Sequence, residues 1–259
     1  MSTSASRSPA ARPARIDAVV HPALADGRTT TVHVARWSRV GTRVRIARLA
    51  PQRRLADWCA ETGTSDALVG GFYTRPSGVP LGEVRLHGEP VAHEAFTTPW
   101  NLVRACLHVA TSGALRIDRR DRLEAHPAGD LLQAGPLLVR GGGVVCRDGS
   151  DGEGFAAGAH QFDSDITAGR HPRAALGIGR GELLAVVADG RSPDDAGLTL
   201  GELARVLAGL GATTAMNLDG GGSASLVCDG QLRNRPREQH GIELAGGRAI
   251  TTVIAFDAA

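Results

Sequence analysis

A strand–helix–strand pattern between residues 183 and 219 constrains the fold more than any other part of the sequence. Residues 183–188 are a continuous apolar run, typical of a strand buried on both faces, and a second apolar segment ends at Leu218. Between them, Thr199 and Glu202 have the spacing of a capping box, and leucines at helical spacing follow. Two strands joined by a helix form a right-handed crossover with parallel strands. We therefore expect an α+β or mixed α/β fold, whose central mixed sheet contains this βαβ unit and whose N-terminal part is strand-rich.

Further secondary structure is predicted on both sides of this unit. Alternating apolar residues over 29–49 suggest two strands that form a hairpin around Gly41. Residues 54–61 suggest a short helix, and a small apolar strand then ends at Gly70. The last strand is expected near residues 249–256.

The middle of the chain carries short apolar segments separated by glycine and proline. Residues 84–150 are therefore interpreted as a strand-rich region, with a hairpin turn at residues 141–143. The sequence Gly177-Ile178-Gly179-Arg180-Gly181 resembles a dinucleotide fingerprint but precedes a strand instead of opening a helix. We interpret it as another hairpin turn.

The composition restricts the chemistry that the chain can perform. All 29 basic residues are arginine, which excludes a Walker-type phosphate loop, a Schiff-base mechanism and a lysine general base. The formal net charge of +2 gives no argument for nucleic acid or for an acidic membrane. No apolar run approaches the roughly 20 residues of a membrane span. We expect neither nucleic acid nor membrane as a partner.

The chain is expected to consist of a disordered tail, residues 1–15, and one domain, residues 16–259, because no repeat or linker is found. Polar, Gly-rich residues 147–170 suggest a mobile loop. The tail lacks the apolar segment of a secretory signal, so we expect a cytoplasmic protein with reduced thiols. The four cysteines have neither paired spacing nor a His cluster, so no structural metal is expected.

The two strands of the crossover end in acidic residues that are followed by glycine. Asp189-Gly190-Arg191 follows the first strand, and Asp219-Gly220-Gly221-Gly222-Ser223 follows the second. Parallel strands end at the same edge, where ligands bind, so Asp189, Arg191 and Asp219 are expected to lie together. Three residues without Cβ let backbone N–H groups approach an anion. A single Asp before Gly would be a turn residue, but two at one edge favour a site.

These residues resemble a known family. The segment from Arg173 to the D-G-G-G-S string is similar to the phosphodiester glycosidase family. Gly70-Gly71-Phe72-Tyr73 with Leu81-Gly82 resembles its N-G-G-F-F and L-G segment, Gly135-Pro136-Leu137-Leu138 its G-P-x-L strand, and Asn234-Arg235-Pro236 its N-x-P turn. The likeness covers about residues 30–256. Two positions depart from the family pattern: Val69 replaces an Asn, and Gly247 replaces the Glu expected before Arg248.

The resemblance implies a hydrolase that cleaves the glycosidic C1–O bond of a sugar 1-phosphodiester and needs no cofactor. Asp219, with Asp189 as second choice, would attack C1 or activate water. Arg173 and Arg191, with the amides of Gly220, Gly221 and Gly222, would hold the phosphate. The other substrate contacts that we expect are Gly70, Gly71, Phe72, His171, Asn217, Ser223 and Arg248.

Two other functions remain open from the sequence. Cleavage of the P–O bond would make the protein a phosphodiesterase, and oxygen-18 water distinguishes the two bonds. A non-catalytic binder of sugar phosphates or nucleotide sugars would fit the missing polar residue at Val69. The expected partner is a small sugar phosphodiester. Because we expect a cytoplasmic protein, this substrate would be an intracellular metabolite. The sequence leaves open whether the chain forms a homo-oligomer. Loops 74–80, 94–101 and 147–170 are expected to carry specificity.

Overall fold

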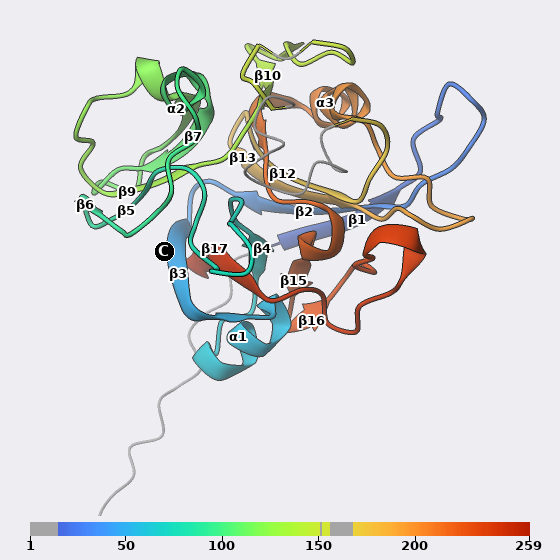
Figure 1. Cartoon of the computed structure of the whole chain (residues 1–259), viewed down its shortest axis with the longest axis horizontal. Helices are drawn as coiled ribbons and strands as arrows, with labels where there is room; N and C mark the ends of the chain where they lie inside the picture. Colours follow the sequence, from blue (N-terminus) through green and yellow to red (C-terminus); the bar gives the residue numbers. More distant parts are fainter. Residues whose placement is uncertain (1–14, 151, 156–167) are drawn as a thin grey trace, which may run out of the picture.

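The protein is built mainly from antiparallel strands in three sheets (Figure 1). The structure, a computed structural model, describes residues 15–150, 152–155 and 168–259. All pairs of neighbouring strands in these ranges run antiparallel. The predicted tail, residues 1–15, lies outside the described residues except for Arg15, as does much of the predicted loop 147–170.

The first sheet is the largest and runs across the middle of the molecule (Figure 1). From edge to edge its seven strands are β1 (Arg15–Val20), β2 (Val32–Ser38), β13 (Glu182–Ala188), β12 (Arg173–Gly179), β14 (Ala212–Asn217), β10 (Leu137–Arg140) and β11 (Gly143–Val144).

The second sheet contains the last long strand of the chain. From edge to edge its strands are β16 (Gln231–Leu232), β15 (Leu226–Cys228), β4 (Ala67–Val69), β17 (Ile250–Ala258) and β3 (Thr42–Arg53).

The third sheet comes entirely from the middle of the chain, which was predicted to be rich in strands. From edge to edge its strands are β6 (Glu89–Pro90), β5 (Val84–Leu86), β9 (Asp130–Gln133), β7 (Ala105–Val109) and β8 (Leu115–Arg119).

Helices cover the outside of this arrangement, and α1 and α3 each bury one face against a sheet. In Figure 1, α3 lies over the first sheet and α1 lies below the second sheet. The helices of the described residues are α1 (Leu55–Thr62), α2 (Trp100–Val103), α3 (Leu200–Gly209) and the 3-10 turns η1 (Arg120–Arg122), η4 (Gly221–Ser223) and η5 (Gln239–Gly241).

Strand β13 is buried on both faces, as its continuous apolar sequence predicted. Leu183, Ala185 and Val187 point into the main core, which the first sheet shares with the other two sheets. Leu184 and Val186 point to the opposite face, where α3 covers a smaller core. Side chains alternate between the two faces of a strand, so such a run needs apolar partners on both sides.

The predicted βαβ unit, and with it the α+β or mixed α/β fold class, is wrong. Helix α3 does connect β13 to β14, but β12 lies between these strands and pairs antiparallel with both. The capping box is present: Glu202 N–H donates to Thr199 Oγ1 at 3.1 Å, and Thr199 N–H donates to Glu202 Oε2 at 2.9 Å. Local patterns therefore predicted the helix correctly. They could not show that β12, which precedes β13 in the chain, lies between β13 and β14 in the sheet.

The hairpin predicted around Gly41 is also wrong, although both of its strands exist. Strand β2 pairs with β1 and β13 in the first sheet, whereas β3 pairs with β17 in the second. Trp37 of β2 and Phe256 of β17 stack with their ring centroids 4.0 Å apart, which joins the two sheets face to face. The turn at Gly41 thus carries the chain from one layer to the other.

Candidate active site

The D-G-G-G-S segment joins the first sheet to the second. Strand β14 ends at Asn217, and the N–H of Leu218 still donates to the carbonyl of Ala174 in β12 at 2.9 Å. The next N–H, that of Asp219, donates instead to the carbonyl of Gly70, directly after β4, at 3.0 Å. The segment therefore brings Asp219 to the Gly70-Gly71-Phe72-Tyr73 motif, two sequence regions that were both predicted to belong to the site.

Close backbone contacts explain two of the glycines in these motifs. A Cβ on Gly70 would lie 2.4 Å from Thr252 Oγ1, and a Cβ on Gly220 would lie 2.8 Å from the carbonyl oxygen of Pro172. The N–H of Gly220 donates to Asp219 Oδ1 at 2.8 Å, and the N–H of Gly221 donates to Pro172 O at 2.9 Å. Two of the three amides that were predicted to hold phosphate thus have acceptors within the protein.

Asp219 is the buried acid at the centre of this region. Asp219 is only 5% exposed, and this burial raises the pKa of its carboxyl group to about 6. The charges of Arg248 and Arg75 and the N–H of Gly220 oppose this shift and favour the carboxylate. Ser223, which is fully buried, lies beside the same carboxyl group.

Tyr73 places a phenol next to this acid. Its hydroxyl donates to the carbonyl of Ala249 at 3.0 Å, one residue after Arg248. Burial and the charge of Asp219 raise the pKa of Tyr73, so the phenol stays protonated at neutral pH. The carboxylate of Asp219, the phenol of Tyr73 and the guanidinium of Arg248 therefore form one cluster.

Arg248 is oriented by an acid that the sequence did not reveal. Its Nε donates to Glu238 Oε1 at 2.7 Å, and its Nη2 donates to Glu238 Oε2. The backbone N–H of Arg248 donates to the carbonyl of Gly222 at 2.9 Å. Arg248 is thus tied through both its backbone and its side chain to the loop that carries Asp219.

Asp189 lies at the same edge as Asp219 but has different partners. Its Oδ1 accepts the backbone N–H of Arg235 at 2.7 Å, and its Oδ2 lies 3.0 Å from His33 Nε2. Because β12 separates β13 from β14, two strand spacings, or about 10 Å, separate their backbones. The carboxylate of Asp189 holds the loop around Arg235 against β2.

The other side chains predicted to bind substrate, Arg173, Arg191 and His171, contact backbone carbonyl groups in the structure. Arg173 donates through Nε to Leu198 O at 3.0 Å and through Nη2 to Gly169 O at 3.1 Å. Arg191 donates to the carbonyl of Arg237 at 3.0 Å, and His171 Nε2 lies 2.6 Å from the carbonyl of Ala168. These three side chains connect the loops that surround the strand ends.

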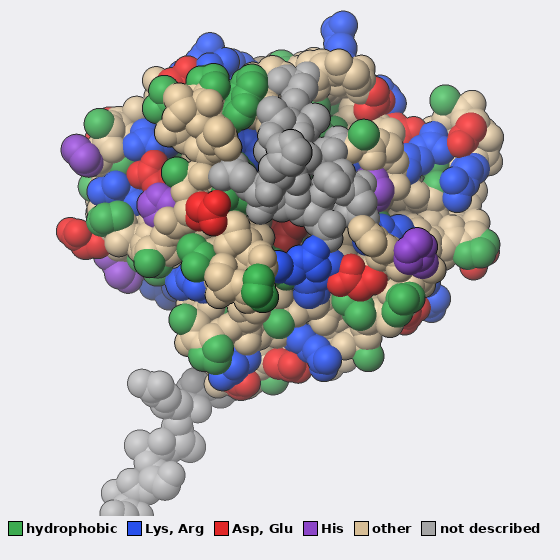
Figure 2. All heavy atoms as spheres, viewed as in Figure 1, with side chains coloured by type: hydrophobic (Ala, Val, Ile, Leu, Met, Phe, Trp, Pro, Cys, Tyr) green, Lys and Arg blue, Asp and Glu red, His purple; other side chains and the backbone are tan. Residues whose placement is uncertain are grey.

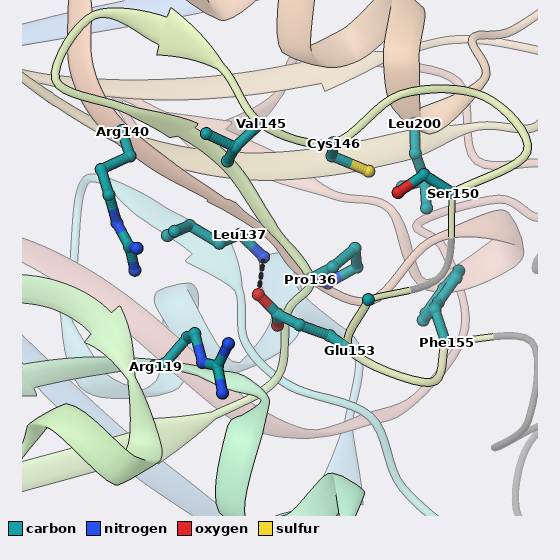
Figure 3. A pocket seen from close by; sticks show the side chains of 11 residues that line it. Arg119, Pro136, Leu137, Arg140, Val145, Cys146, Ser150, Glu153, Phe155 and Leu200 are labelled. Carbon is teal, nitrogen blue, oxygen red and sulfur yellow. Dashed lines mark hydrogen bonds between the residues drawn. The ribbon is translucent and has the colours of Figure 1, made fainter.

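Asn217, at the end of β14, is bonded to the segment before β10, which lines a pocket. Asn217 Nδ2 donates to the carbonyl of Gly135 at 3.1 Å. The adjoining pocket, of about 180 Å³, is seen in Figure 3, where Glu153 Oε1 accepts the N–H of Leu137 at 3.0 Å. Arg119 and Arg140 also line it, but they pair with aspartates at 2.7 Å each. Both arginines that line this pocket are therefore paired with acids.

Phe72 is a core residue and not a surface contact. It is 1% exposed and packs against Phe96 and Phe155, and all three rings surround the guanidinium of the buried Arg104. This packing fixes the backbone of the motif from which Tyr73 reaches Asp219.

Within the described ranges, no group of three or more His, Cys, Asp or Glu residues has the arrangement of a metal site. No helix in the same ranges is long and apolar enough to cross a membrane. Figure 2 shows acidic and basic side chains mixed over the visible face, in keeping with the formal net charge of +2.

Residues 62–256 match the family model described as phosphodiester glycosidase. The chain belongs to the phosphodiester glycosidase family. It is 28% identical over 196 residues to N-acetylglucosamine-1-phosphodiester alpha-N-acetylglucosaminidase of Mus musculus, which covers 73% of this chain and 37% of that protein. The Bos taurus protein of the same name is 28% identical over 186 residues, covering 68% and 33%. The chain thus spans about a third of the length of these relatives.

Solved structures share the fold of this phosphodiester glycosidase family member. The zebrafish N-acetylglucosamine-1-phosphodiester alpha-N-acetylglucosaminidase catalytic domain, auto-inhibited by its pro-peptide, matches with a TM-score of 0.72 and 21% identity, over 98% of this chain and 86% of that chain. A hypothetical protein from Synechocystis matches with a TM-score of 0.62 and 18% identity, over 95% and 62%.

Four residues near the candidate site were not predicted from the sequence as site residues. Tyr73 directly follows the residues chosen from its motif, and Arg75 lies in loop 74–80, so both had a signal. Glu238 and His33 had no sequence signal. Glu238 pairs with Arg248, 10 residues away in the chain, and His33 lies beside Asp189, 156 residues away.

Proposed function

We propose that the protein hydrolyses the glycosidic C1–O bond of a sugar 1-phosphodiester, releasing the free sugar and a phosphate monoester. The observation that supports this most directly is the buried Asp219, whose carboxyl pKa is raised to about 6 beside the charges of Arg248 and Arg75. The names of the two mammalian relatives specify an N-acetylglucosamine 1-phosphodiester. An N-acetylglucosamine 1-phosphodiester is therefore the first substrate to test.

The proposed roles follow from the charge that develops during C1–O cleavage. The leaving group is a phosphate monoester, which departs readily when its charge is compensated, so cations matter more than a strong acid. We assign this role to Arg248, whose charge acts on Asp219 and whose backbone is bonded to the loop of Asp219, in place of Arg173 and Arg191, which donate to backbone carbonyls. Asp219, ionised above pH 6, attacks C1 or activates water.

Asp189 acts as a positioning residue in this proposal. Both of its carboxylate oxygens bind groups on other elements, His33 of β2 and the backbone of Arg235. It therefore fixes the strand end and the neighbouring loop, and its contribution to the rate is indirect.

Hydrolysis in oxygen-18 water tests the bond that is cleaved. We expect the label in the sugar, because water or Asp219 attacks C1. Label in the phosphate would replace the proposal by a phosphodiesterase. Ligand binding without turnover of any sugar 1-phosphodiester would replace it by a non-catalytic binding protein.

Asp219→Asn tests the residue at the centre of the mechanism. The amide is isosteric and its oxygen can still accept the N–H of Gly220, so the fold should persist. We expect kcat to fall by two orders of magnitude or more, a size typical of removing a positioned catalytic group. A variant that keeps a near-normal kcat would remove Asp219 from the chemistry.

A further inference from the structure

Glu238 and Arg248 form a bidentate ion pair next to Asp219. The carboxylate oxygens of Glu238 accept Nε–H and Nη2–H of Arg248, and the two side chains are 26% and 18% exposed. Two parallel hydrogen bonds fix the plane of a guanidinium as well as its position. The pair with Glu238 therefore fixes the orientation of the guanidinium whose charge acts on Asp219.

The backbone shows why this carboxylate comes from position 238. The residue before Arg248 is Gly247, where the resemblance to the family led us to expect Glu. Gly247 has a φ of 83°, and a Cβ there would lie 2.8 Å from Ser225 Oγ. A glutamate at 247 would be both strained and crowded. Glu238, at the start of η5, supplies the charge instead.

We propose that Glu238 is the positioning residue for the guanidinium that binds the substrate phosphate. This inference rests on the proposed function, which assigns the phosphate to Arg248. Glu238 occupies the edge of the guanidinium formed by Nε and Nη2. The edge formed by Nη1 and the second N–H of Nη2 points away from Glu238, and its two donors match two oxygens of a phosphate.

Gly222 makes room for this pair. A Cβ on Gly222 would lie 2.9 Å from Glu238 Oε1 and 3.0 Å from Leu244 Cδ1. The carboxylate could move away from such a methyl group, but it would then lose its paired contact with Arg248. The third glycine of the D-G-G-G-S segment thus serves the orientation of Arg248.

Glu238→Gln is the main test, because the amide keeps the shape but can accept only one of the two N–H groups. The measurements are the dissociation constant of inorganic phosphate by calorimetry, and KM and kcat with an N-acetylglucosamine 1-phosphodiester. We expect the phosphate dissociation constant to rise about tenfold, the loss of one charge-assisted hydrogen bond, and kcat/KM to fall by about as much, because Arg248 compensates the charge that develops on the leaving phosphate. Glu238→Asp, with a shorter reach, should recover only part of this loss.

Glu243→Gln is the matched control. Glu243 lies on the same loop and also pairs with an arginine, Arg237, at 3.2 Å, but its side chain is 56% exposed and that arginine is not assigned to the phosphate. We expect its phosphate affinity to stay within about twofold of wild type.

Gly222→Ala provides an independent route to the same result. It should weaken phosphate binding in the same direction as Glu238→Gln. The double variant should be no weaker than the more affected single variant, because both changes disrupt one pair.

The outcomes separate this inference from the proposed function. Phosphate affinity of Glu238→Gln within twofold of wild type, an equal loss in Glu243→Gln, or no phosphate binding by wild type would overturn it. A lower melting temperature with unchanged phosphate affinity would reduce Glu238 to a structural residue and overturn it too. If Glu238→Gln weakens phosphate binding but wild type cleaves no diester at C1–O, the proposed function fails and the positioning role stands.

Discussion

Asp219 is held between two opposing electrostatic influences. Burial favours its neutral form and raises its pKa to about 6, while Arg248 and Arg75 favour the carboxylate. A carboxyl group with this pKa is ionised at neutral pH yet more basic than an exposed aspartate. It can therefore act as a base or a nucleophile at neutral pH.

The pH dependence of the reaction should report this pKa. Because the carboxylate is the active form, we expect kcat/KM to rise with pH, with an inflection near pH 6, and then to level off. A pH–rate profile with the diester measures it, and the residual activity of Asp219→Asn should lack the inflection. Activity that falls as the pH rises through 6 would instead make Asp219 a general acid.

The same shift predicts a stability effect. The folded-state pKa of about 6 exceeds the ordinary value of 3.8, so the stability associated with the protonated form is present below pH 3.8 and is lost as the pH rises through 6. Asp219→Asn removes the buried charge and should gain stability over wild type across this window, by at most about 3 kcal/mol at pH 8.

Denaturant unfolding at pH 4 and pH 8 measures this gain. Asp57→Asn, at an exposed residue in the first turn of α1, is the control and should show no comparable pH-dependent gain. Equal stability of Asp219→Asn and wild type at both pH values would show that burial does not penalise this carboxylate.

At the scale of single elements, the sequence predicted what local patterns determine. Helix α3, its capping box and the hairpin turns after Ile178 and Arg140 follow from nearby residues and were correct. The pairing of strands depends on contacts between distant residues, so the inserted β12 and the separation of β2 from β3 could not be derived. Strand β1 was missed because its pattern of exposed residues resembles a tail.

The end of β4 yields a prediction about a glycine. A Cβ on Gly70 would overlap Thr252 Oγ1, which accepts the N–H of Gly71 at 2.9 Å. Gly70→Ala should therefore destabilise the protein by about 2 kcal/mol or more and lower kcat, because Gly70 also accepts the N–H of Asp219. Denaturant unfolding and steady-state rates measure both effects.

Gly209→Ala is the control for this change. Gly209 is the last residue of α3, and a Cβ there has no neighbour within 4 Å. It should leave kcat unchanged and stabilise the protein slightly, by up to about 1 kcal/mol. Destabilisation by both variants alike would show that space around Gly70 is not the cause.

At the scale of the whole molecule, the candidate site depends on layers that the sequence could not assemble. The motifs that carry Asp219, Gly70 and Tyr73 were all recognised, but their meeting point lies between two sheets, not at the edge of one. The partner of Arg248 was missed for the same reason, since Glu238 comes from a loop with no recognisable pattern. Sequence therefore predicted the components of the site better than their arrangement.

Trp37→Ala tests how strongly the two sheets are joined. Trp37 is 1% exposed and stacks on Phe256 of the second sheet at 4.0 Å. We expect a loss of about 3–5 kcal/mol in the free energy of unfolding, from lost burial and an unfilled cavity. Val40→Ala, 88% exposed just beyond β2, should change it by less than about 0.5 kcal/mol. A small effect of Trp37→Ala would indicate that the layers are held elsewhere.

The hydrogen bond from Asp219 to Gly70 makes the position of this acid depend on how the two layers are aligned. A small slide of one layer over the other would draw the acid away from Tyr73 and Arg248 without altering any of them. Substitutions deep in the interior should therefore be able to lower the proposed activity from a distance. Laboratory evolution of new substrate preferences would do best to leave that interior intact and to vary the exposed Pro76 and Ser77.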